Sequence, residues 1–194
     1  MHRIITTLVV SLLLWAAQTG CAGREKTPEP AESTAEATMV KEKIELTSPA
    51  FMGGGTILQR HTCDGMDVSP ALNWGDPPAG SAAFALICDD PDAPVGTWVH
   101  WVIYNIPDTA RGLPEAVPDT PQLEDGAVQG LSDFKRIGYG GPCPPPGKPH
   151  RYFFKLYALD SPVKLPAGAT KSELLKAMEG HILAEGQTMG TYGR

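Results

Sequence analysis

The sequence predicts a mostly β protein, a two-sheet antiparallel β-sandwich with one or two short helices. Of its 194 residues, 21 are Gly and 19 are Pro, and these residues divide the chain into short segments. Aromatic and β-branched residues gather in runs between the breaks, as they do in strands. A single helical pattern appears, late in the chain, so no alternating series of strands and helices can be built.

Five segments have the composition of strands. Residues 44–46 and 56–58 are short apolar segments, and residues 82–88 are apolar almost throughout, as in a strand that is buried on both faces. Residues 98–105 and 151–159 are dense in aromatic and β-branched side chains, which favour a half-buried strand.

A helix is predicted over residues 172–183. Leu174, Leu175 and Met178 recur at helical spacing, and Thr and Ser residues suited to an N-cap precede them.

The first 21 residues predict an export signal. A basic start at His2 and Arg3 is followed by an almost unbroken apolar stretch over residues 4–17 and by small residues before Cys21. The stretch is shorter than the roughly 20 residues of a spanning helix, although a permanent transmembrane helix stays the alternative.

The Gly20-Cys21 junction resembles a bacterial lipobox, in which Cys21 is lipidated and becomes the mature N-terminus. Gln18 stands where that pattern prefers Leu, and ordinary signal-peptidase cleavage nearby is the other interpretation. We expect an exported cell-envelope lipoprotein, attached to a membrane through its N-terminal lipid and either facing the periplasm or otherwise extracytoplasmic. Residues 22–43 are rich in Glu, Lys, Pro, Ala, Ser and Thr and predict a disordered tether, which leaves residues 44–194 as the folded domain.

Charge argues against nucleic acid as a partner. The net charge is -6 and the sequence has no run of Lys or Arg. Affinity for a phosphate backbone depends on clustered cations.

Three cysteines follow Cys21. Cys88 lies in an apolar strand-like run, where cysteine behaves as a small buried hydrophobe. Cys63 and Cys143 lie in loops and can meet in an oxidising compartment. We predict a disulfide between Cys63 and Cys143, with two free loop thiols as the alternative.

Three segments combine polar side chains with a restricted backbone. These are DDPDAP at 89–94, WVHW at 98–101, and the stretch from GYGGPCP at 138 to HRY at 152. Each adjoins an apolar strand, and loops at strand ends can bring distant residues into one pocket.

Four runs carry a resemblance to a known family: CDGMDVSPALNW, DDPDAPVGTWVHWVIYNIP, GYGGPCPPPGKPHRYFFKLYALD and GHILAEGQTMGTYGR. In this order they resemble the bacterial, Raf-kinase-inhibitor-like branch of the phosphatidylethanolamine-binding family. The resemblance implies a two-sheet antiparallel sandwich with a small surface pocket for phosphate-like groups, including phospholipid head groups.

Matched position by position, the resemblance places residues in that pocket, with Gly140, Gly141 and Pro142 at its lip, and the chemistry of their side chains is consistent with it. The imidazoles would donate hydrogen bonds to an anion, and successive glycine N–H groups would form an anion nest. A carboxylate would orient an imidazole or accept from a ligand ammonium, and aromatic rings would form apolar walls. The Ala93-Pro94 bond is a candidate cis peptide by resemblance. The predicted ligand-binding residues are Asp90, Asp92, Trp98, His100, Gly140, Gly141, Pro142, His150 and Tyr152.

The predicted function is non-enzymatic ligand binding, without catalytic residues, cofactor or metal. A role as inhibitor or modulator of a partner protein follows from the family alone. The alternative is a hydrolase or metal-dependent enzyme that uses Asp90, His100 and His150. Taken alone, Asp-Pro-Asp would more often form a turn and His100 would more often be a core histidine.

Overall fold

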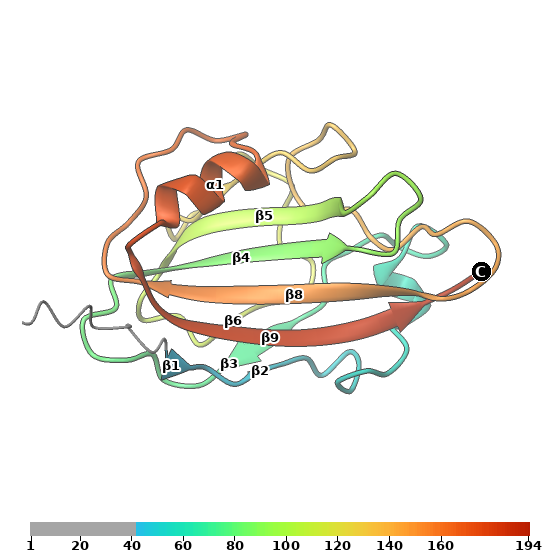
Figure 1. Cartoon of the computed structure of the whole chain (residues 1–194), viewed down its shortest axis with the longest axis horizontal. Coiled ribbons are helices and arrows are strands. Elements are labelled where there is room, and N and C mark those ends of the chain that lie inside the picture. The colour runs from blue at the N-terminus through green and yellow to red at the C-terminus, as the bar shows by residue number, and fades with distance from the viewer. Residues whose placement is uncertain (1–41) are drawn as a thin grey trace, which may run out of the picture. The chain divides into compact units, whose positions relative to one another are not determined.

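The structure is a computed structural model that describes residues 42–194, which form two β-sheets and one α-helix (Figure 1). The six-stranded sheet has the order β1-β9-β8-β4-β5-β7, and the three-stranded sheet has the order β2-β3-β6. The elements are β1 (Glu42–Lys43), β2 (Leu46–Thr47), the 3-10 helix η1 (Gln59–His61), β3 (Leu72–Trp74), β4 (Ala83–Asp90), β5 (Trp98–Pro107), β6 (Gly112–Leu113), β7 (Val128–Gln129), β8 (His150–Leu159), α1 (Lys171–Met178) and β9 (Ile182–Tyr192).

The predicted signal peptide at 1–21, with Cys21, lies outside the described residues. So does most of the predicted tether. Its last two residues differ from the prediction, because Glu42 and Lys43 form β1 and pair in parallel with β9. In residues 42–194, no helix has the length and apolar character needed to cross a membrane.

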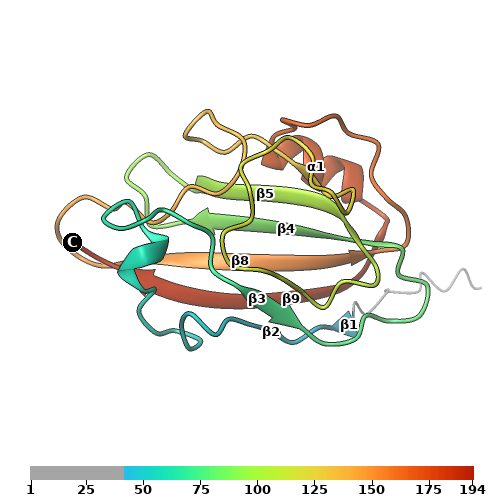
Figure 2. The same ribbon diagram turned by 180° about the vertical axis from the view of Figure 1, so that it is seen from behind.

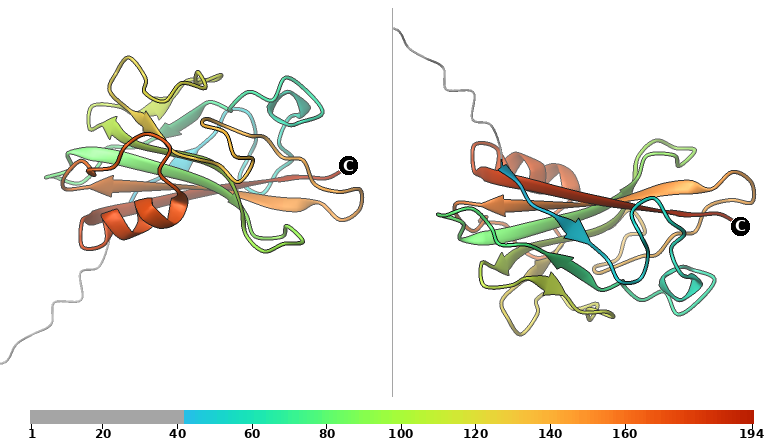
Figure 3. Two further views of the ribbon diagram at one scale, coloured as in Figure 1. Left: turned by 90° about the horizontal axis from the view of Figure 1, so that it is seen from above. Right: turned by 90° about the horizontal axis from the view of Figure 1, so that it is seen from below.

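The predicted antiparallel sandwich is confirmed. The long strands β9, β8, β4 and β5 lie side by side in this order and pair antiparallel, and among the named strands of the described residues only the short β1 pairs in parallel. Seen from behind, β2 and β3 lie in front of the large sheet (Figure 2). Helix α1 covers its opposite face (Figure 3). The large sheet is therefore the middle layer.

This middle position explains the apolar run in β4. Phe84, Leu86 and Cys88 pack in the core under the small sheet, whereas Ala85 and Ile87 pack in the core under α1. Successive side chains of a strand point to opposite faces, so a strand covered on both sides must be apolar at nearly every position.

The predicted helix is confirmed in its N-terminal part only. A capping box starts α1: the Thr170 hydroxyl accepts from the Glu173 N–H, and the Glu173 carboxylate accepts from the Thr170 N–H. The extension to residue 183 is wrong. Gly180 adopts a φ of +80°, which ends the helix, and Ile182 already belongs to β9.

Strand β9 is the longest element that the sequence did not predict. Its buried positions are Ala184, Gly186, Thr188 and Gly190. A Cβ on Gly186 would lie 2.5 Å from the Ile44 carbonyl oxygen, so these small residues let other segments pack closely on the strand. Because glycine in a sequence usually indicates a turn or loop, the glycines of this segment did not predict a strand.

Other short strands also differ from the prediction. The segment at 44–46 is not continuous, because it connects β1 to β2. The segment at 56–58 makes only an isolated bridge, from Thr56 to Thr191. Strands β3, β6 and β7 have two or three residues each, too few to produce a periodic pattern.

Candidate functional site

Three strand ends form the candidate site. Strand β4 lies between β5 and β8, it ends at Asp90 opposite Trp98 of β5, and β8 starts at His150. The three polar motifs therefore meet at one end of the large sheet. A pocket of about 220 Å³ is lined there by Asp90, Ala93, Pro94, Val95, Trp98, His100, Phe134, Cys143, Pro144, Pro145, His150 and Tyr152.

Asp90 orients His150. The His150 Nδ1 lies 2.7 Å from Asp90 Oδ2, and the other carboxylate oxygen accepts from the Asp92 N–H at 2.8 Å. Both side chains are buried. Each Asp90 oxygen already has a partner, so this carboxylate acts mainly by holding the imidazole in place.

His100 is held by the loop opposite it. Its Nδ1 lies 2.6 Å from the Gly140 carbonyl oxygen, which can only accept, so Nδ1 carries the proton of the neutral ring. Nε2 is then an acceptor. Burial lowers the pKa of His100 below its ordinary value, against the opposing influence of the Gly140 backbone and Asp90. His100 is therefore a neutral imidazole that offers a lone pair.

Tyr152 contributes a buried hydroxyl without a partner. Its side chain is 1% exposed, and its Oη has no hydrogen-bond partner within the described part of the chain. Burial and the nearby Asp90 raise its pKa well above the ordinary value, so the hydroxyl stays protonated and can donate. An unpaired buried donor costs stability, and it is satisfied when a ligand acceptor enters the pocket.

Aromatic rings form the walls. Trp98 and His100 each contact Phe134 edge to face, with centroid distances of 5.4 and 5.3 Å, and His100 also meets Tyr152 at 5.1 Å. The sequence did not predict Phe134. It lies in an irregular loop without periodicity, and no pattern around it indicated that it covers His100.

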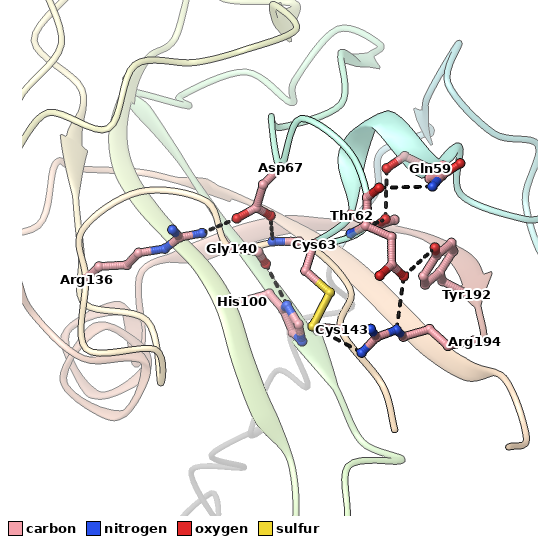
Figure 4. The surroundings of a disulfide bond; sticks show 12 residues. Gln59, Thr62, Cys63, Asp67, His100, Arg136, Gly140, Cys143, Tyr192 and Arg194 are labelled. Atoms are coloured by element: carbon pink, nitrogen blue, oxygen red, sulfur yellow. Dashed lines mark hydrogen bonds and ion pairs between the residues drawn. A yellow bond between two sulfur atoms is a disulfide. The ribbon is translucent and has the colours of Figure 1, made fainter. Parts of the chain in front are cut away.

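The glycine loop does not form the expected anion nest. The Gly140 N–H donates to the His100 carbonyl oxygen at 2.9 Å, and the Gly141 N–H donates to Asp67 Oδ1 at 2.7 Å. Both donors are thus engaged within the protein. Figure 4 shows Asp67 between Arg136 and the turn at Gly140.

These glycines are needed for close packing instead. A Cβ on Gly140 would lie 2.5 Å from the Phe134 ring, and one on Gly141 would lie 2.4 Å from the His61 carbonyl oxygen. Pro142 follows them, is buried and accepts from the Cys63 N–H at 3.1 Å, and does not line the pocket.

Asp92 differs most from its predicted role. Its carboxylate binds the Arg151 guanidinium through two bonds of 2.7 and 2.8 Å and also accepts from the Arg151 N–H. These bonds lower the Asp92 pKa to about 2. Asp92 lines a neighbouring hollow rather than the pocket, and it fastens the β4–β5 loop to β8. The Ala93-Pro94 peptide in the same loop is trans, so the expectation of a cis bond is wrong.

The predicted disulfide between Cys63 and Cys143 is present, with the two Cα atoms 5.4 Å apart (Figure 4). Cys88 is free and buried, as predicted. Because Cys143 lines the pocket, the disulfide ties the pocket rim to the segment that follows η1. A cross-link over 80 residues is expected to contribute about 3–5 kcal/mol in the chain-entropy model.

The charges of the site are unusual for an anion pocket. Its lining residues include Asp90 and two histidines, with neither Lys nor Arg among them. Residues 42–194 also contain no group of three or more His, Cys, Asp or Glu side chains arranged to hold a metal ion.

Comparisons with known proteins agree on one family. Residues 47–193 match the family model described as phosphatidylethanolamine-binding protein. A protein of Methanothermobacter thermautotrophicus named UPF0098 is 52% identical over 151 residues, which cover 78% of this chain and 99% of that protein. An Aquifex aeolicus protein of the same name is 48% identical over 153 residues, covering 78% of this chain and 89% of that protein.

Two solved structures are similar throughout the domain. The crystal structure of YbcL from E. coli, titled a new member of the mammalian PEBP family, has a TM-score of 0.73 and 33% identity, and the match covers 78% of this chain and 99% of YbcL. A putative phosphatidylethanolamine-binding protein homologue from Chlamydia trachomatis gives 0.72 and 40%, with 79% and 99% covered.

Proposed function

Because the chain belongs to the phosphatidylethanolamine-binding protein family, we propose that its pocket binds a small oxyanion, a phosphate-like group or phospholipid head group, without catalysing a reaction. Any protein partner that the domain modulates would contact the loops around this pocket. The family supports a ligand-binding or modulator role in general, and the pocket geometry supports the choice of ligand.

The Tyr152 hydroxyl carries the proposal. It is a protonated, buried donor in a pocket that two imidazoles also line, and it has no acceptor within the described residues. Native proteins pair the great majority of their buried polar groups. An oxygen of an entering ligand would supply the missing acceptor.

Binding without catalysis is supported by how the reactive groups are used. Asp90 has both oxygens engaged, and Cys143 is bonded to Cys63. Neither side chain is left as a free nucleophile. The remaining groups hold and orient a ligand, which is what binding requires.

Calorimetric titration of the full chain with inorganic phosphate and with phosphoethanolamine tests the proposal. Wild-type protein should bind at least one of them, and Tyr152→Phe should bind it about 10- to 100-fold more weakly, because a hydrogen bond to a charged group contributes about 1.5–3 kcal/mol. Tyr157→Phe is the matched control, since Tyr157 lies on the same strand but lines a different hollow. Equal loss in both variants, or no loss in either, would contradict the assignment.

We also propose that the chain is an exported lipoprotein attached through Cys21. The signal-like start of the sequence supports this, and so does a disulfide whose two residues, Cys63 and Cys143, are exposed to solvent and would persist in an oxidising compartment. Mass spectrometry of the mature chain from the native host should find a lipid on Cys21 and no lipid after Cys21→Ala. A mature chain that starts elsewhere would refute lipidation.

A further inference from the structure

The pocket has neutral donors but no permanent countercharge for an anion. Tyr152 and the indole of Trp98 are neutral. Asp90 carries a carboxyl group, which would repel an oxyanion rather than attract it. Arg151 follows His150 in the sequence, but its guanidinium is bound to Asp92, which lines a neighbouring hollow and not the pocket. Within the lining of the pocket, countercharge for an anion can therefore come only from an imidazolium, on His100 or on His150.

His100 cannot donate to an anion in its neutral form. Its one ring proton is committed at Nδ1 to the Gly140 carbonyl oxygen, at 2.6 Å. Figure 4 shows one nitrogen of the His100 ring joined to Gly140 and the second nitrogen on the far side of the ring. A lone pair there repels an anion oxygen unless a proton lies between the two.

The groups that surround His100 decide whether a proton is tolerated there. Asp90 on β4 and Asp67 behind the glycine loop favour the imidazolium, although Asp67 is paired with Arg136 at 2.6 Å. From β8, Tyr152 is neutral and His150 faces Asp90. Burial disfavours the charged ring and keeps the pKa of His100 low in the empty pocket. A bound anion opposes that effect by placing a negative charge beside the ring.

The tautomer and the charges together limit the ligand class. We propose that the pocket binds an oxyanion together with one proton, which is shared between the ligand oxygen and a pocket imidazole, first of all His100 at Nε2. A singly protonated phosphate or phosphate monoester brings this proton itself. An oxyanion without a proton binds only as the imidazole takes one up from solvent. The inference rests on the proposed oxyanion function and deepens it.

Sulfate is the sharpest probe, because it carries no proton near neutral pH. Titrations of the full chain between about pH 5 and 8, in buffers of different ionisation enthalpy, give both the affinity and the number of protons taken up. We expect uptake of about one proton per sulfate. We also expect the affinity for sulfate to fall about tenfold per pH unit above the pKa of the pocket imidazole in the unliganded protein. Singly protonated phosphate should bind with less uptake than sulfate does.

Wild-type protein alone can overturn the inference. If sulfate binds with constant affinity and without proton uptake, the proton coupling is wrong while the proposed function stands. If sulfate, phosphate and phosphoethanolamine all fail to bind at any pH, the proposed function itself fails. These two failures are distinguishable in one series of titrations.

Variants identify the imidazole that takes the proton. His100→Gln places an amide donor near the position of Nε2, so sulfate binding should lose its pH dependence, whereas His150→Gln should keep it. His181→Gln is the control, because His181 also pairs with an aspartate, Asp160 at 2.8 Å, at the opposite end of β8 and β9. A loss of pH dependence in His150→Gln alone would assign the proton to His150 and overturn the choice of His100.

Discussion

Asp89 and Asp90 are consecutive residues of β4, yet they serve opposite faces of the large sheet. Asp89 is fully buried on the helix side and is paired with two ammonium groups, Lys155 at 2.9 Å and Lys171 at the start of α1. Asp90 is buried on the pocket side and is paired with the imidazole of His150. A register shift between Cys88 and Asp89 lies just before this pair.

The difference between the two faces shows how an aspartate can either support the fold or form part of a pocket, depending on its partners. Both oxygens of Asp89 accept hydrogen bonds from lysine ammonium groups, so the carboxylate on that face is fully paired within the protein. The pocket face combines titratable imidazoles with an unpaired hydroxyl on Tyr152. The fully paired face supports the fold, whereas the face with incomplete pairing is the one for which we propose ligand binding.

The largest effect is expected on the helix side. The double substitution Lys155→Met and Lys171→Met leaves the Asp89 charge buried without a partner, which should lower the free energy of unfolding by about 3–5 kcal/mol. Denaturant unfolding measures this loss. The affinity for phosphate should be unchanged where the variant is folded, because neither lysine lines the pocket.

A weaker affinity at unchanged stability would mean that these lysines reach the pocket electrostatically. The single variant Lys155→Met is the control, since Asp89 keeps Lys171 and a smaller loss is expected. The comparison between the two faces therefore depends on separate readouts of stability and binding.

Opening the disulfide should affect both properties together. Cys63→Ser with Cys143→Ser removes the cross-link and should cost about 2–5 kcal/mol of unfolding free energy. The affinity for phosphate should also fall, because Cys143 is part of the pocket rim. Reduced wild-type protein should behave like the variant in the same unfolding experiment. Equal stability with and without reductant would rule out a stabilising cross-link.

The same contrast explains what the sequence could predict of the fold. The apolar run of β4 predicted a strand that is buried on both faces, because every position of the middle layer meets a core. β9 follows the reverse rule: Gly186 and Gly190 are buried because other segments approach them closely, and local propensity cannot reveal such contacts.

The candidate site was predictable as a cluster but not in its bonding. Asp90, His100 and Tyr152 each lie at the end of an apolar strand, and the strand order brings them together. The bond from Arg151 to Asp92 depends on how the β4–β5 loop folds over β8. Phe134 comes from a loop without periodicity, so tertiary packing alone places it in the pocket.

Tyr152→Phe should raise stability while it weakens binding, so its effect on stability is smaller than that of the preceding variants and opposite in sign. Removing the unpaired hydroxyl should raise the unfolding free energy of the unliganded protein, by up to about 1–3 kcal/mol, while binding of phosphate weakens. Thermal unfolding with and without phosphate measures both. Tyr139→Phe should instead lose stability, because its hydroxyl donates to the His61 carbonyl oxygen at 2.9 Å. A destabilised Tyr152→Phe would show that the hydroxyl already has a partner.

The smallest effect is expected at Asp92, two residues beyond the pocket carboxylate. Arg151 holds the pKa of Asp92 down at about 2, below its ordinary 3.8, so the folded state loses this contribution only as pH falls from about 4 towards 2. Asp92→Asn should therefore lower the Tm at neutral pH by no more than about 2–4 °C, because Arg151 is half exposed and the pair is screened. The difference from wild type should shrink as the pH falls towards 2, and it should also shrink in high salt. The affinity for phosphate should not change. A loss of affinity as large as that of Tyr152→Phe would instead place Asp92 in the binding site, because it would show that a carboxylate fixed by an arginine still reaches the ligand.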